Sequence, residues 1–123
     1  MKGLSIQPVE VHGALIAQVT GAPGAIQDAN AISQMLAQLA KGQFTRVLAA
    51  RELIDEGRFD LRTGFVTQLA RQLGDYQIRL AVYGNIKLVE SLALKAYLQA
   101  AGLAGSARFC SSREEALRWL ARP

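Results

Sequence analysis

Stretches of alternating or continuous hydrophobic residues along the chain predict strands. Residues 9–12 alternate and residues 14–19 are apolar, so we expect a hairpin with its turn at His12-Gly13. Three later apolar runs are short and bounded by turn residues, which is typical of buried parallel strands. They span 45–50, 76–83 and 107–110.

Between these runs, hydrophobic residues recur at helical spacing, which predicts four amphipathic helices, the first over about residues 29–41. The third helix is expected to turn Leu94, Tyr97, Leu98 and Ala101 inward. The expected N-caps are Asp28 or Asn30, then Thr63 or Asp60, then Ser91, and finally Ser112 in a capping box with Glu115. The glycines expected to end the first three helices are Gly42, Gly74 and Gly102.

Strand-strand-helix followed by alternating strands and helices predicts an α/β fold. We expect a mainly parallel five-stranded sheet with an N-terminal antiparallel hairpin and four helices. A length of 123 residues fits a single domain over residues 1–123. The segment 51–58 is charged and irregular, with Leu53 and Ile54 as its expected anchors in the core.

The cysteine content and the distribution of apolar residues indicate the cellular compartment that we expect for this protein. Cys110 is the single cysteine, so an internal disulfide is impossible and a reducing compartment is expected. Residues 1–5 lack the apolar core of a signal peptide, and no apolar run approaches the roughly 20 residues that span a bilayer. We therefore expect a cytoplasmic protein without membrane contact.

The net charge of +4 comes from arginines that are scattered singly along the chain, with acids between many of them. This pattern favours a solvated surface and makes a nucleic-acid partner unlikely. The hairpin leaves an edge strand, and Tyr97 and Trp119 are large, so the sequence leaves monomer and homodimer open.

Known catalytic and cofactor motifs are missing from the sequence. Residues 21–24 lack the lysine and spacing of a P-loop, and there is no GxGxxG, GxSxG or HExxH. With His12 and Cys110 as the single residues of their types, most triads and zinc sites cannot be assembled in one chain. The sequence therefore predicts no catalytic residue, no metal site and no cofactor. His12 is expected to be a turn residue and Cys110 a buried structural thiol.

The densest cluster of turn and capping chemistry is residues 59–64, at an expected junction of strand and helix. Ligands of an open α/β sheet bind beyond the carboxyl ends of its strands, and this junction lies there with residues 84–87 and 110–112. The residues expected to bind a partner or ligand are Asp60, Arg62, Thr63, Gly64 and Asn85. Helix capping is the alternative role for Thr63 and Asp60.

The predicted element order resembles that of STAS-like domains, found in anti-sigma-factor antagonists and at the cytoplasmic ends of sulfate transporters. Those domains carry an Asp-Ser-Ser-Gly type turn before the second helix, and in some a serine there is phosphorylated. The matching residues here are Leu61-Arg62-Thr63-Gly64, with the acid displaced to Asp60.

A closer resemblance is to an uncharacterised bacterial family of small domains that read Phe-Asp-Leu-x-Thr-Gly. The residues that carry it are Phe59–Gly64, Tyr76, Leu80–Asn85, Phe109 and Glu114–Ala116. Gln68 stands where that family usually has an acid, and Gln99-Ala100-Ala101 where it has Glu-x-Asn. The family has no established activity.

Together these resemblances imply a regulatory STAS-like module that binds a protein partner or a small anionic ligand through the turn before the second helix. A small enzyme that uses Asp60, Arg62, Thr63 or Asn85 in the same cleft is the alternative. A weak nucleic-acid binder that uses the scattered arginines is a third hypothesis.

Overall fold

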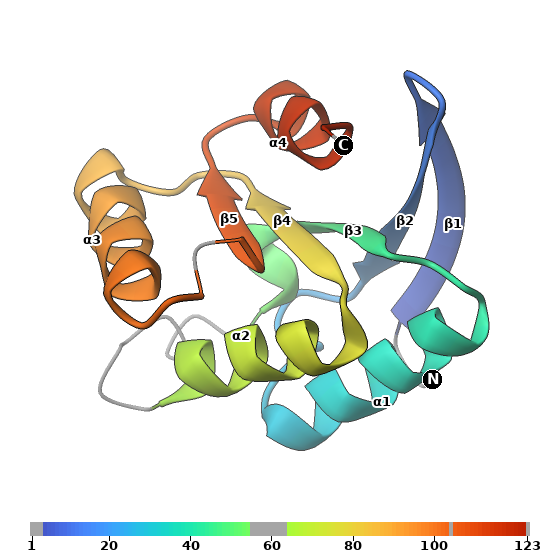
Figure 1. The fold of residues 1–123 in the computed structure, drawn as a ribbon, viewed down its shortest axis with the longest axis horizontal. Coiled ribbons are helices and arrows are strands. Elements are labelled where there is room, and N and C mark those ends of the chain that lie inside the picture. Colours follow the sequence, from blue (N-terminus) through green and yellow to red (C-terminus); the bar gives the residue numbers. More distant parts are fainter. Residues whose placement is uncertain (1–3, 55–63, 104, 123) are drawn as a thin grey trace.

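The computed structural model describes residues 4–54, 64–103 and 105–122, which form a sheet covered by helices on both faces (Figure 1). The sheet has five strands in the order β1-β2-β3-β4-β5. They are β1 (Leu4–Val11), β2 (Ala14–Gly21), β3 (Arg46–Ala50), β4 (Arg79–Tyr83) and β5 (Ala107–Cys110). The α-helices of the described ranges are α1 (Ala29–Lys41), α2 (Phe65–Tyr76), α3 (Leu88–Ala100) and α4 (Arg113–Leu120). The strand β1 pairs antiparallel with β2 and all later pairs are parallel, so the predicted α/β fold is confirmed.

The hairpin turns at His12-Gly13 as predicted, with φ of 50° and 80° at these two residues. The two residues that flank such a turn form a hydrogen-bonded pair, and pair types alternate along the ladder. Pro8, opposite Ala17, therefore falls at a non-hydrogen-bonded pair, with its ring nitrogen on the outer edge of β1. A proline there interrupts the outer edge without removing a bond to β2.

Three helices cover one face of the sheet, and α4 alone among the described helices covers the other (Figure 1). Alternate residues of β3 point to opposite faces, so Val47 packs with the three helices and Leu48 packs beneath α4. The cluster beneath α4 consists of Ile16, Leu48, Ala81, Cys110, Ala116 and Leu120. Burial on both faces explains why the central strands are apolar throughout.

Polar groups at both ends hold α4 in place. At its start, the Ser112 hydroxyl accepts a hydrogen bond from the Glu115 N–H at 3.2 Å, as the predicted cap requires. At its end, the Arg79 guanidinium donates to the carbonyl oxygens of Leu120 (2.9 Å) and Arg122 (2.7 Å). The same guanidinium lies 5.4 Å from the ring centroid of Trp119, within the range of a cation–π contact.

The boundaries of α2 differ from the prediction at both ends. Its N-cap is Gly64, in the left-handed region at φ 75°, so the assignment of that position to Thr63 or Asp60 is wrong. The helix also continues through Gly74, because Gln77 adopts the left-handed conformation that closes it. In consequence β4 begins at Arg79 and not at residue 76.

The start and the inner face of α3 also differ from the prediction. The N-cap is Lys87, so Ser91 lies inside the helix, where its hydroxyl donates to the Phe109 carbonyl oxygen at 3.1 Å. Ala101 follows the helix and is exposed, whereas Leu94 and Leu98 are buried as expected. The helix begins one turn early because Ile86 is buried and fixes the approach of the chain.

Replacing Arg79 by methionine tests how strongly its hydrogen bonds hold the end of α4. Methionine keeps an apolar side chain of similar length but lacks the guanidinium N–H donors. Loss of two hydrogen bonds to helix-end carbonyls is expected to lower the free energy of unfolding by about 1–3 kcal/mol in urea titrations. The matched control is Arg71→Met on the exposed side of α2, which is expected to change it by less than about 0.5 kcal/mol. Equal losses in the two variants would contradict a specific role of Arg79.

Candidate functional site

A cavity of about 510 Å³ opens at the carboxyl ends of β3 and β4. Its lining comes from the residues that end or follow these strands and from the start of α3. They are Ala50, Arg51, Glu52, Tyr83, Gly84, Asn85, Lys87 and Glu90. This is the edge of an open α/β sheet at which ligands generally bind.

The segment after β3 forms one wall of this cavity. Arg51–Leu53 form a single 3-10 turn, and the buried side chains of Leu53 and Ile54 anchor it as the sequence predicts. The backbone of the loop after β2 is bonded to it, from the Gly24 N–H to the Glu52 carbonyl (2.7 Å) and from the Ile26 N–H to the Leu53 carbonyl (2.9 Å). Arg51 and Glu52 therefore lie on backbone that two hydrogen bonds tie to the loop after β2.

An ion pair links the wall formed by the 3-10 turn to α3. The Arg51 guanidinium lies 3.2 Å from the Glu90 carboxylate, and their side chains are 17% and 31% exposed. Partial burial weakens the screening by water that makes fully exposed pairs nearly neutral in energy. The pair fixes the orientation of Arg51 at the cavity and ties β3 to the start of α3.

Gly84 shapes the opposite wall, where β4 ends. Its φ of 144° is a conformation that residues with a side chain rarely adopt, and an added Cβ would lie 3.2 Å from the Arg51 Cβ. The Ile86 N–H donates to the Gly84 carbonyl at 2.8 Å, which tightens the turn. The turn leaves Asn85 and Lys87 exposed on either side of the buried Ile86.

The cavity can hold a ligand through ion pairs and hydrogen bonds. Arg51 and Lys87 provide cationic donors, Asn85 and Tyr83 provide neutral donors and acceptors, and Glu90 with Glu52 provide carboxylates. Among its described lining residues there is no histidine, cysteine or serine. No three His, Cys, Asp or Glu side chains gather as a metal-binding group in the described ranges of the chain.

Of the five binding residues predicted from the sequence, the structure describes two, Gly64 and Asn85. Asn85 lines the cavity, and Gly64 is the N-cap of α2, with no atom of the other described residues within 4 Å of an added Cβ. Asp60, Arg62 and Thr63 lie outside the described residues, so their role stays a prediction. Sequence reasoning named the segments but missed the individual residues Arg51 and Lys87, although Arg51 directly follows a buried strand, which is a usable signal.

The third segment expected at this edge contributes a buried thiol. Cys110 is 1% exposed and packs beneath α4, as expected of a structural cysteine. Burial raises the pKa of the Cys110 thiol to about 11, and the Glu115 carboxylate adds to this while Arg108 opposes it. The thiol is therefore protonated and shielded at neutral pH.

The fold and the cavity together define an α/β domain with a mixed sheet and a cavity lined mainly by polar residues at one edge. Its sequence matches the family described as domain of unknown function DUF4180 over residues 11–120, and the chain belongs to this family. Membership of an uncharacterised family is thus confirmed, whereas the STAS-like relationship and the motif of residues 59–64 stay predictions. No curated protein matches the sequence. In the described part of the chain, no helix is long and apolar enough to cross a membrane.

Substituting Gly84 by alanine tests the shape of the cavity wall. The positive φ and the close approach to Arg51 are expected to cost about 1–3 kcal/mol of unfolding free energy, measured by thermal or urea unfolding. Gly105→Ala is the control, because nothing lies within 4 Å of its added Cβ and its φ is ordinary. A Gly84→Ala variant as stable as Gly105→Ala would show that the turn is not constrained.

Thiol labelling tests the burial of Cys110. A thiol of pKa about 11 holds roughly 100-fold less thiolate at pH 8 than an exposed thiol of ordinary pKa 9.0. Native protein is therefore expected to react with a disulfide reagent at least that much more slowly than protein unfolded in urea. Equal rates in native and unfolded protein would place the thiol at the surface.

Proposed function

We propose that this protein is a regulatory binding domain that takes up a small anionic ligand in the cavity at the carboxyl ends of β3 and β4. The observation that carries this proposal is the convergence of Arg51 and Lys87, from two separate connections, on one cavity with Asn85 and Tyr83. Cations and amide donors from independent segments are what recognition of a carboxylate or phosphate requires.

The start of α3 adds to the attraction for an anion. Lys87 is the N-cap and offers no side-chain acceptor to the first-turn N–H groups. Those amides carry the positive end of the helix dipole toward the same edge of the sheet. Glu52 and Glu90 offset the cations, so the cavity favours a ligand with one anionic group and further hydroxyl or amino groups over a polyanion.

The turn before α2 supplies the sequence-based part of the proposal. Asp60, Arg62, Thr63 and Gly64 are proposed as further contacts, either with the ligand or with a protein partner that responds to it. Binding is better supported than catalysis, because the described lining residues supply ion pairs and hydrogen bonds and no nucleophilic thiol or imidazole.

A thermal-shift screen against small carboxylates and monophosphates tests the proposal. A ligand at 100 times its Kd stabilises the folded state by about 2.7 kcal/mol, which gives a clear rise in Tm. Lys87→Glu is expected to abolish the response to any compound found. Lys95→Glu, the same charge change on an exposed residue of α3 outside the cavity, is expected to retain it.

Two results would contradict a ligand site in this cavity. One is a screen in which no small anion raises Tm. The other is a stabilising compound whose effect is equal in Lys87→Glu and Lys95→Glu, which would place its site elsewhere.

A further inference from the structure

The strand β5 is an edge of the sheet and lies at the bottom of a groove. It pairs with β4 alone, so its other side has no strand neighbour within the described ranges of the chain. One hollow of about 290 Å³ runs between β5 and α3, and a second of about 250 Å³ runs between β5 and α4. Both are lined by Arg108 and Glu115, so the two hollows adjoin along the open edge of the strand, and together they are called the β5 groove.

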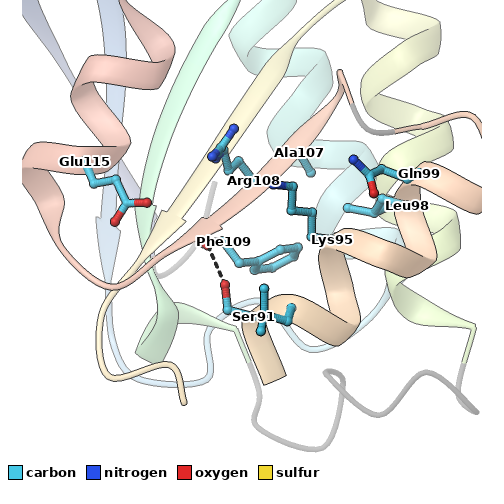
Figure 2. Close-up of a pocket in the computed structure, with 9 residues that line it drawn as sticks. Ser91, Lys95, Leu98, Gln99, Ala107, Arg108, Phe109 and Glu115 are labelled. Carbon is cyan, nitrogen blue, oxygen red and sulfur yellow. Dashed lines mark hydrogen bonds between the residues drawn. The ribbon is translucent and has the colours of Figure 1, made fainter. Parts of the chain in front are cut away.

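The backbone of β5 shows which polar groups face this groove. The Leu80 N–H donates to the Ser106 carbonyl (2.9 Å), and the Gly84 N–H donates to the Cys110 carbonyl (3.2 Å), so these carbonyls face β4. Directions alternate along a strand, and the N–H and C=O of Ala107 therefore point outward. The Phe109 carbonyl also points outward, because it accepts the hydroxyl of Ser91 on α3 (Figure 2).

The two halves of the groove differ in chemistry. On the α3 side, Figure 2 shows Phe109 between β5 and the helix, near Leu98 and Lys95. The side chain of Leu92, at 56% one of the exposed large hydrophobic residues, lines the same half. On the α4 side, Arg108, Arg118 and Arg122 surround the hollow beside Trp119, and Glu115 is the one acid that lines it among the described residues. The α3 half therefore combines apolar side chains with polar ones such as Ser91, Lys95 and Gln99, and the α4 half is strongly cationic.

The cationic half is built by the fold. Its arginines come from β5, from the last turn of α4 and from the residues that follow α4. Arg79 bonds the carbonyls of Leu120 and Arg122 and stacks near Trp119, so it fixes the end of α4 and with it the placement of these side chains. Arg118 and Arg122 are exposed and lie on the surface beside the groove.

We propose that the groove along β5 binds an extended segment of a partner protein in which apolar and acidic residues alternate, and that this segment adds to the sheet as a sixth strand. A strand laid on β5 presents its side chains alternately to the two faces of the sheet. Its apolar residues then enter the α3 half, and its acidic residues meet the arginines of the α4 half. The backbone pairing centres on Ala107, and Ser91 marks the end of the open stretch at Phe109.

This site is independent of the cavity at the carboxyl ends of β3 and β4, because the two share no described lining residue. Other partners fit the groove less well. A nucleic acid would pair its phosphates with the arginines of the α4 half. It would make no use of the apolar side chains of the α3 half or of the outward N–H of Ala107. A second copy would have to bring an acidic edge strand, and Lys95 and Arg108 give the two β5 edges like charges.

Fluorescence anisotropy with synthetic octapeptides tests the proposal on the whole chain. The probe alternates valine and glutamate, and two control peptides contain four valines followed by four glutamates, or alternating valine and lysine. We expect saturable binding of the probe and at least about tenfold weaker binding of both controls. The double variant Arg118→Glu/Arg122→Glu is expected to weaken the probe by about tenfold or more, and the exposed Arg71→Glu to leave it unchanged.

Backbone pairing is tested by methylating the amide nitrogens of the probe, on all valines in one peptide and on all glutamates in another. Only one of the two sets faces β5, so one methylated peptide is expected to lose at least about tenfold in affinity while the other keeps it. Equal behaviour of the methylated pair, or equal binding of the alternating and blocked peptides, overturns strand addition. A concentration-dependent dimer in sedimentation that Arg118→Glu/Arg122→Glu dissociates, together with no saturable binding of the probe, would assign the groove to a second copy instead.

Discussion

The packing of α4 against the sheet is the contact on which the rest of the structure depends. It is the described helix that shields Leu48 and Ala81 in the middle of the sheet, and with eight residues it is too short to be stable alone. Its stability comes from the apolar contacts of Leu120, from the Ser112 cap and from the bonds of Arg79 to its last carbonyls. The contacts that hold α4 also position one wall of the β5 groove. The stability of the fold and the placement of the surface arginines therefore depend on the same contacts.

The fold was largely predictable because its signals are local. Hydrophobic period identified every strand and α-helix of the described ranges, the caps Asp28 and Ser112 were predicted correctly, and His12-Gly13 marked the hairpin turn. The errors lie at boundaries where tertiary packing overrides a local signal. Glycine has a low helix propensity, yet α2 continues past Gly74 and ends where Gln77 adopts the left-handed conformation. The first half of β1, from Leu4 to Pro8, was not predicted as a strand, because proline is typical of turns and is tolerated only at strand edges.

The site was less predictable because it depends on which separate connections meet. Parallel topology alone indicated the carboxyl edge and placed Asn85 there. It could not single out Arg51 or Lys87, whose importance arises from the ion pair with Glu90 and from the backbone turn at Gly84. The clustering of charge was unpredictable for a related reason. Arginines that are scattered along the sequence predict a solvated surface, and Arg118 and Arg122 are exposed, but the sequence does not show that β5 and the end of α4 bring three arginines around one hollow.

Pro8 determines how far edge-to-edge association of this domain could extend. A sheet with two receptive edges can join the β5 of one copy to the β1 of the next, and such head-to-tail contacts grow into open fibres. Pro8 has no N–H on the outer side of β1, so that edge lacks a donor in its middle. Pairing along this edge is therefore interrupted at Pro8, and the fold disfavours head-to-tail growth from the β5 of one copy to the β1 of the next.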